Sequence, residues 1–218
     1  GLWVIASDGT SAWSIPFDAD PRADTGHDLF HQDAGNGLAC ASCHPEGSDD
    51  GFVWTLDAKR RRTLSLRVGL DDTEPFHWTG DFPGFPRIVD DIYTARMGGL
   101  ELSDARYDAF RGWVYGLEPL RSEPGDAVQV GRGAVLFASL GCGGCHDAAA
   151  LVDGRQADLG VSLQVPSLVG IAQRPPYMHD GRLTDLASAV GQMVLDVAPN
   201  AELSFDDSLA LTAYVASL

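Results

Sequence analysis

The pattern Cys-x-x-Cys-His occurs twice in this chain of 218 residues and restricts its fold more than any other feature. The two copies use all four cysteines: Cys40, Cys43 and His44 form the first, and Cys142, Cys145 and His146 form the second. Two thiols three positions apart can bond to the two vinyl groups of one haem, and the adjacent histidine then lies under the iron. The sequence therefore predicts two covalently bound haem c groups, with His44 and His146 as iron ligands.

Other uses of cysteine explain this pattern less well. Four cysteines in an exported protein can form two disulfides, but their spacing favours haem attachment. A zinc site would need each Cys-x-x-Cys pair to be completed by further nitrogen or sulfur ligands. One zinc site shared by both pairs is chemically possible, but it leaves the adjacent histidines without a role. A thioredoxin-like motif would need a β-α-β setting, whereas the surrounding sequence has a helical pattern.

The second half of the sequence repeats the first at an offset of about 101 or 102 residues. A short helical phrase precedes each motif: GHDLF at Gly26–Phe30 and GAVLF at Gly133–Phe137. Further matches follow each motif: Ser65, Leu66, Gly69, Pro75, Phe76 and Gly80 correspond to Ser167, Leu168, Gly170, Pro176, Tyr177 and Gly181. The chain is therefore interpreted as a tandem duplication.

Each half ends in an amphipathic helical pattern with apolar residues spaced three and four apart. These residues are Tyr107, Phe110, Trp113, Val114 and Leu117 in the first half, and Leu211, Tyr214, Val215 and Leu218 in the second. Ser103 and Ser204 are the predicted N-caps, with Asp104, Asp206 and Asp207 in the first turns, where the helix dipole favours negative charge.

We expect a mainly α fold with two tandem cytochrome c-like helical domains, each around one covalent haem c. Residues 24–120 form the first module and residues 125–218 the second; the linker, Glu118–Gly125, contains two prolines and a glycine. Residues 1–23 match neither repeat. Their phrases LWVIAS and SAWSIPF predict a lead-in of two short strands, which could be the end of an upstream domain.

The composition restricts the partners of this chain. Its 31 acidic residues against 15 Lys and Arg give a formal charge of -16, which disfavours nucleic acid and suits a basic redox partner protein. No apolar run approaches the roughly 18 residues that cross a bilayer, and the first residues lack a signal-peptide pattern. Because c-type haem is attached outside the bacterial cytoplasm, we expect a periplasmic or extracellular protein. It could be a mature protein or part of a larger chain or assembly.

The ligand on the second face of each iron separates electron carriers from enzymes. Met97 and Met193 lie 57 and 51 residues after the first cysteine of their modules and are the favoured sixth ligands, because thioether is a common haem partner. Met178 is the alternative for the second haem. The first iron could instead stay open or bind a histidine. The remaining histidines are His31 and His77, which are the main rivals of Met97, and His27 and His179.

Five phrases carry a family resemblance: RRTLSL (61–66), PFHWTGD (75–81), RMGG (96–99), VPSLVGIAQRPPYMHDG (165–181) and LASAVGQM (186–193). Together they resemble the bacterial diheme cytochrome c peroxidase family, which includes the methylamine dehydrogenase maturation enzyme. The resemblance covers the chain from about residue 24. It implies that Met193 is the distal ligand of the C-terminal, high-potential haem and that Trp78 lies between the haems and helps electrons pass. It also implies that the N-terminal haem is the one that would receive hydrogen peroxide.

The first half departs from the family pattern at three places. Arg96 replaces the glutamate that assists peroxide cleavage, and a cation cannot act as that carboxylate base. Residues 45–59, where peroxidases supply a displaceable histidine, contain none. Arg62 aligns with the asparagine that helps to hold calcium between the domains, which argues against calcium and leaves Arg62 as a candidate cofactor-binding residue.

These departures favour an electron-transfer protein with two haems. Without the acid and base groups, peroxide cleavage loses a factor of typically a hundred to ten thousand. A diheme peroxidase that reduces hydrogen peroxide at the N-terminal haem is the alternative, and no catalytic residue is assigned. The sequence therefore predicts redox chemistry and leaves open whether the protein is an enzyme.

Overall fold

The computed structural model describes residues 2–5, 12–15, 24–56, 58–70, 73–122, 124–146, 156–158 and 162–218. The described part is mainly helical, as the sequence predicts. Its helices are α1 (Thr25–His31), α2 (Phe85–Arg87), α3 (Asp104–Tyr115), α4 (Ala127–Ser139), α5 (Leu186–Val197) and α6 (Phe205–Ala216). A π-helix, η4 (Ile88–Arg96), continues α2, and four 3-10 turns are η1 (Cys40–Ser42), η2 (Pro45–Gly47), η5 (Cys142–Gly144) and η6 (Ile171–Gln173). Within these residues, no helix has the length and apolar composition of a membrane span.

The strands form short antiparallel pairs. They are β1 (Leu2–Ile5) with β2 (Ala12–Ile15), β3 (Val53–Leu56) with β4 (Lys59–Arg62), and β5 (Gln156–Asp158) with β6 (Ser162–Gln164). In the first pair Leu2 lies opposite Ile15, and in the second Val53 lies opposite Arg62. The two short strands expected in the lead-in segment are therefore confirmed.

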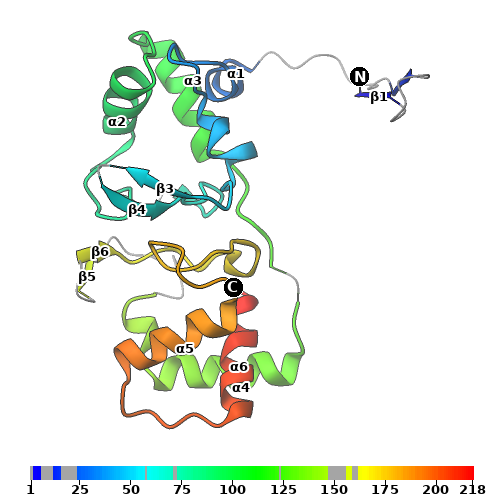
Figure 1. Cartoon of the computed structure of the whole chain (residues 1–218), viewed down its shortest axis with the longest axis vertical. Coiled ribbons are helices and arrows are strands. Elements are labelled where there is room, and N and C mark those ends of the chain that lie inside the picture. The colour runs from blue at the N-terminus through cyan, green and yellow to red at the C-terminus, as the bar shows by residue number, and fades with distance from the viewer. Residues whose placement is uncertain are drawn as a thin grey trace.

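A glycine sets the crossing of the first and last helices in each half. A Cβ atom on Gly26 would collide with the Ala109 carbonyl of α3, and one on Gly133 would collide with the Ala210 carbonyl of α6. Only glycine permits so close an approach of two backbones. The glycines of GHDLF and GAVLF therefore have the same role. They let α1 cross closely over α3 and α4 over α6 (Figure 1).

Each crossing lies in its own hydrophobic cluster, and the two clusters share no residue. The first cluster contains Leu29, Phe30, Val68, Leu70, Phe85, Val89, Tyr93, Phe110 and Val114. The second contains Phe137, Ile171, Tyr177, Ala189, Val194, Leu211 and Val215. The apolar positions predicted for the two closing helices supply the centre of each cluster.

The two closing helices begin where the sequence predicts but are capped differently. The Ser204 hydroxyl accepts a hydrogen bond from the Asp207 N–H at 3.1 Å, and the Asp207 carboxylate accepts one from the Ser204 N–H at 3.2 Å. This reciprocal pair is a capping box. Ser103 is the N-cap of α3, as the sequence predicts, but its side chain makes no capping hydrogen bond.

The loops PFHWTG and PYMHDG have the same backbone shape. A β-bridge closes each loop, pairing Phe76 with Phe82 and Tyr177 with Leu183. His77 and Met178 occupy the same position and both have left-handed backbone angles, with φ of 71° and 67°. Trp78 and His179 follow at equivalent places. The duplication thus extends from the sequence to the backbone conformation of these loops.

The two halves meet through reciprocal backbone hydrogen bonds. The Arg62 N–H donates to the His179 carbonyl at 2.9 Å, and the Gln164 N–H donates to the Trp78 carbonyl at 2.8 Å. Arg62 corresponds to Gln164 in the repeat, and Trp78 to His179, so an approximate two-fold axis relates the two bonds. Gln164 Nε2 adds a bond to the Thr73 carbonyl at 2.9 Å. These contacts lie where β4 and β6 end, between the two helical groups (Figure 1).

Candidate functional site

The two Cys-x-x-Cys-His motifs adopt the same tight turn. In η1 the His44 N–H donates to the Cys40 carbonyl at 2.9 Å, and in η5 the His146 N–H donates to the Cys142 carbonyl at 2.9 Å. The residues between the cysteines are small, Ala and Ser in the first motif and two glycines in the second. Each turn follows the first helix of its half, so the crossing of α1 over α3 or of α4 over α6 fixes where it lies.

No disulfide joins any of the four cysteines. In the part of the chain that the structure describes, no cysteine belongs to a group of three or more His, Cys, Asp or Glu side chains that could hold a metal ion. Burial raises the pKa of Cys40 to about 11 and also raises the pKa of Cys142.

The surroundings of His44 fit a proximal haem ligand. Its Nδ1 atom is fully enclosed and makes no hydrogen bond in the structure. Burial lowers the pKa of this imidazole, although the nearby backbone of Ser48 and Leu64 and the carboxylates of Asp49 and Asp50 oppose the shift. A neutral imidazole is the form that binds a metal ion.

Met97 lies immediately after the π-helix η4 and is buried, with 6% of its surface exposed. The Asn36 N–H donates to its carbonyl at 2.9 Å, and the Asn36 amide donates to the Arg96 carbonyl at 3.0 Å. The hydrophobic cluster of the first half does not include Met97. A buried thioether outside the core cluster is consistent with a side chain that faces a cofactor.

The pKa of His77 depends on burial and on charges near the first Cys-x-x-Cys-His motif. Its pKa is lowered mainly by burial, and the charges of Arg96 and His44 lower it further, while Asp81 opposes them. Its ring lies against Phe82 with centroids 3.9 Å apart. His77 therefore lies close enough to His44 for their charges to interact, which sequence spacing could not show.

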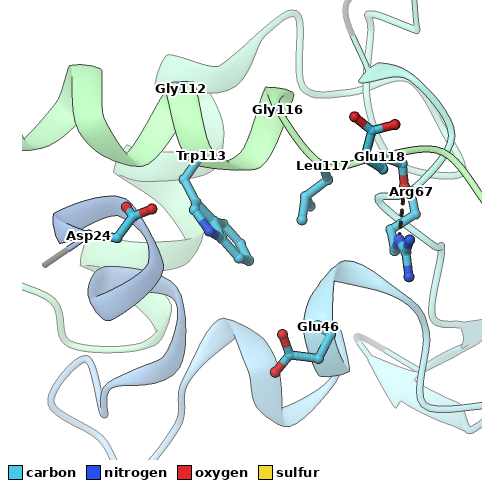
Figure 2. Close-up of a pocket in the computed structure, with 8 residues that line it drawn as sticks. All are labelled: Asp24, Glu46, Arg67, Gly112, Trp113, Gly116, Leu117 and Glu118. Carbon is cyan, nitrogen blue, oxygen red and sulfur yellow. Dashed lines mark hydrogen bonds between the residues drawn. The ribbon is translucent and has the colours of Figure 1, made fainter. Parts of the chain in front are cut away.

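The other two histidines of the first half lie together on α1. His31 Nε2 is 3.0 Å from a carboxylate oxygen of Glu46, and the rings of His27 and His31 stack with centroids 4.0 Å apart. A groove of about 580 Å³ opens beside them, lined by Trp113 and Glu46 among others (Figure 2). His31 is thus engaged by Glu46.

The second half separates its two methionines. Met178 packs against the hydrophobic cluster of this half, whereas Met193 does not belong to it. Met193 lies inside α5, and Met97 lies after the corresponding helical stretch of the first half. Although both follow the repeated loops, the two favoured ligands are therefore not at equivalent positions of the repeat.

Trp78 lies at the contact between the two halves. It is 9% exposed, and its Nε1 donates to the Arg62 carbonyl at 2.9 Å. Its ring meets that of His179 edge-on with centroids 6.3 Å apart. Because Trp78 and His179 are equivalent in the repeat, two aromatic side chains face each other near the approximate two-fold axis.

Arg62 belongs to a buried ionic group at the same contact. Its guanidinium lies 3.2 Å from the Asp49 carboxylate, and the two side chains are 5% and 7% exposed. Burial lowers the pKa of Arg62, and burial together with the charge of Arg62 lowers the pKa of Arg174 to about 10. The Nε atoms of both arginines are buried and make no hydrogen bond.

Sequence reasoning did not find three members of this contact, Asp49, Gln164 and Arg174. Gln164 could have been found from the repeat, since it aligns with Arg62. Asp49 lies in the 45–59 stretch, where only the missing histidine was considered. Its role depends on a partner 13 residues away, which no local pattern indicates.

No protein-family model matches the sequence, and no curated protein matches it as a relative. Solved structures do resemble the fold. A MauG-like protein associated with microbial copper homeostasis superposes with a TM-score of 0.65 and 19% identity, over 94% of this chain and 91% of the other. A chain of hydrazine synthase from Kuenenia stuttgartiensis gives 0.65 and 18%, over 99% of both chains.

A variant of the diheme peroxidase BthA from Burkholderia thailandensis gives a TM-score of 0.52 and 14% identity, over 88% of this chain and 84% of the other. At these identities the likeness shows the fold. The similarity of fold that the sequence phrases predict is therefore confirmed. This chain has the fold shared by MauG-like proteins and diheme peroxidases.

Proposed function

We propose that this protein is a diheme c-type cytochrome that transfers electrons through two covalently bound haems, each held by one helical module. The observation that carries this proposal is the doubled Cys-x-x-Cys-His turn together with Trp78 at the contact between the halves. The fold shared with diheme proteins supports it. The modules are residues 24–120 and 125–218, and the two separate hydrophobic clusters support this division.

When bound, each haem supplies an iron that alternates between two oxidation states. The chain's own residues hold and tune it. Cys40 and Cys43 would hold the first haem through thioether links, and His44 would bind its iron. Cys142, Cys145 and His146 would have the same roles for the second haem. Met193 would be the other ligand of the second iron, because Met178 is engaged in core packing. Met97 would be the other ligand of the first iron, with His77 as its rival.

We propose that the buried arginines replace the calcium ion. Arg62 and Arg174 place two guanidinium groups at the contact, with Asp49 as a carboxylate partner of Arg62. A divalent cation would add positive charge to a site that already has an excess of it. Haem propionates would instead suit the two buried Nε–H groups that have no partner.

The second candidate function is peroxide reduction at the first haem, and one observation favours it. His77 is partly exposed, its Nδ1 atom lies 3.7 Å from the Asp81 carboxylate, and burial and the charge of Arg96 lower its pKa. An imidazole at this place is a candidate for the base that the missing glutamate provides in peroxidases. This function requires that Met97 leave the first iron open.

One experiment tests the haem assignment and separates the two functions. The denatured protein is expected to keep both haems, with a mass increased by two haem groups, because thioether bonds survive unfolding. Electron paramagnetic resonance should then show two low-spin ferric haems in the oxidised protein and one in the half-reduced protein, and peroxide should not change either spectrum. Pigment released into acidified organic solvent would overturn the haem c assignment, and a high-spin haem that appears on half-reduction would favour the peroxidase.

Replacing Met97 with Ala is expected to convert the first haem to a high-spin form and to create reactivity with peroxide, because it opens the sixth position. Optical spectra of both oxidation states measure the change. His77→Ala serves as the matched comparison in the same module. A spectrum that changes only in His77→Ala would assign the sixth position to His77.

Replacing Trp78 with Leu is expected to slow electron transfer between the haems without changing either haem spectrum. The indole ring is the aromatic group between the two halves, and its loss leaves an aliphatic gap beside His179. Stopped-flow reduction of one haem, followed by re-equilibration, measures the rate. Trp54→Leu, at an exposed position of β3, is the control and should keep the original rate. Equal rates in all three proteins would exclude Trp78 from the electron path.

The net charge and the proposed haem attachment indicate the kind of redox partner and the cellular location. A charge of -16 favours a basic protein as redox partner, since opposite charges speed association. Covalent haem attachment places the protein in the periplasm or outside the cell.

A further inference from the structure

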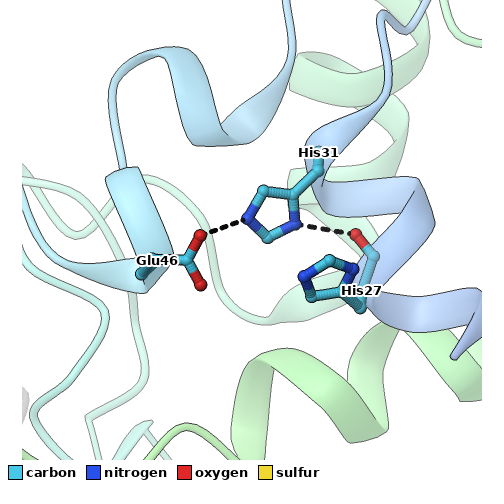
Figure 3. Close-up of side chains that lie close together, drawn as sticks. All are labelled: His27, His31 and Glu46. Carbon is cyan, nitrogen blue, oxygen red and sulfur yellow. Dashed lines mark hydrogen bonds and ion pairs between the residues drawn. The ribbon is translucent and has the colours of Figure 1, made fainter. Parts of the chain in front are cut away.

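A cluster of three metal-binding side chains lies on the first half, apart from the groups used above. His27 and His31 come from α1, and Glu46 comes from η2 (Figure 3). One ligand atom from each lies within 4.8 Å of the other two. We propose that His27, His31 and Glu46 bind a divalent transition-metal ion of the zinc class, in addition to the haem irons.

The helix supplies the spacing of the two histidines. Residues four apart lie on the same face of an α-helix, and two histidines at this spacing form half of many zinc sites. The rings of His27 and His31 are nearly parallel, with an angle of 25° between them. The Asp24 carboxylate accepts a hydrogen bond from the His27 N–H at 3.2 Å, which fixes the start of the helix.

The hydrogen bonds of His31 direct its other nitrogen to a cation. Nδ1 lies 2.9 Å from the His27 carbonyl, which can only accept, so Nδ1 carries the proton. Nε2 then faces a Glu46 oxygen at 3.0 Å. Two acceptors at this distance need a proton or a metal ion between them, so the arrangement is one that a metal ion can occupy.

Glu46 reaches the histidines from an uncommon backbone conformation. Its φ of 49° lies in the left-handed region, which residues other than glycine rarely adopt. The side chain is 76% exposed, so core packing does not hold it there. The carboxylate therefore completes a set of two imidazoles and one carboxylate, the set that zinc uses when it keeps an open fourth position.

The open side of the cluster meets the groove beside α3. Glu46 and Trp113 both line this groove, so water or a small anion can reach the fourth position of a bound ion (Figure 2). The Trp113 ring stands edge-on to both histidine rings, with centroids 5.6 Å from each. An apolar wall on one side and solvent on the other suit a metal site with one exchangeable ligand.

The fold itself does not require these histidines. In the repeat, His27 and His31 correspond to Ala134 and Ala138, while the glycine and the Leu-Phe pair of the helix are kept. The crossing of α4 over α6 forms without them. A role in packing alone would not explain why only the first half carries ligand side chains at these positions.

The test is equilibrium dialysis of the haem-loaded protein, produced without a polyhistidine tag, against zinc chloride, followed by elemental analysis of zinc and iron. We expect one zinc ion for every two iron atoms. His31→Gln and Glu46→Gln should each weaken zinc binding by at least about tenfold. Copper(II) should displace the zinc, because it binds the same ligand types more tightly.

Asp108→Asn is the matched control. It removes the same charge as Glu46→Gln from an exposed position of α3, and Asp108 is not part of the cluster. It should bind zinc as the original protein does. Because Glu46 is exposed, its variant is expected to fold, and the haem spectrum verifies this. Zinc that is absent, or that stays bound equally in all variants, or that Asp108→Asn loses as readily as Glu46→Gln, would overturn the proposal.

Discussion

Asp49→Ala is expected to destabilise the protein by about 3–5 kcal/mol, the loss typical of breaking a buried ion pair. Asp49 and Arg62 are 7% and 5% exposed, so the substitution removes the carboxylate that pairs with Arg62 and leaves the guanidinium buried. The loss of stability also involves Arg174, because the Asp49 carboxylate stabilises the positive charge of this second buried guanidinium. Urea denaturation of the haem-loaded protein, followed by circular dichroism, measures the free energy of unfolding.

An exposed ion pair of the same kind provides the control. Arg87 and Asp91 approach to 2.6 Å, closer than Arg62 and Asp49, but their side chains are 53% and 37% exposed. Asp91→Ala should therefore cost only about 0–1 kcal/mol. Adding Arg62→Met to Asp49→Ala should restore much of the lost stability, since no unpaired charge then remains at that pair. Equal losses in the two single variants would show that burial does not control the energy of the pair.

Met193→His is expected to lower the midpoint potential of the second haem by a few tenths of a volt, within the roughly 0.8 V range that axial ligands cover. A thioether ligand raises the potential of a haem relative to a second imidazole. A spectroelectrochemical titration of both haems measures the change. The first haem should keep its potential, because Met193 lies in α5 of the other half.

Met178→Leu is the comparison for this prediction. Met178 packs against the second hydrophobic cluster, and leucine has nearly the same volume, so the expected loss of stability is below about 1.5 kcal/mol. The potential of the second haem should not change. A shift in Met178→Leu with none in Met193→His would exchange the roles of the two methionines.

The local features of this protein follow from its sequence. The attachment motifs are adjacent residues, so their tight turns depend only on nearby atoms. The closing helices follow from apolar spacing, and the two strands of the lead-in follow from short apolar runs between turn residues. The duplication predicts that each half has the same helix crossing, because the glycine of GHDLF recurs in GAVLF.

Spacing along the chain could not place the candidate ligands in space. Met97 and Met193 lie 57 and 51 residues after their first cysteines, yet the first follows a π-helix and the second lies within an α-helix. The choice between these two helical forms depends on packing against the rest of the half. The sequence likewise predicts His31 as a possible ligand of the first iron. In the fold, its Nε2 atom lies 3.0 Å from a carboxylate oxygen of Glu46.

The two Cys-x-x-Cys-His turns and the repeated helices can be predicted from the sequence, because each depends on neighbours along the chain. The docking of the halves depends instead on contacts that form only in the folded chain. In these contacts Arg62 meets His179, Gln164 meets Trp78, and Asp49 is enclosed with Arg62. The two backbone contacts join residues about a hundred positions apart, whereas Asp49 and Arg62 lie 13 residues apart. Their energy depends on burial at the interface, a property that no single segment possesses.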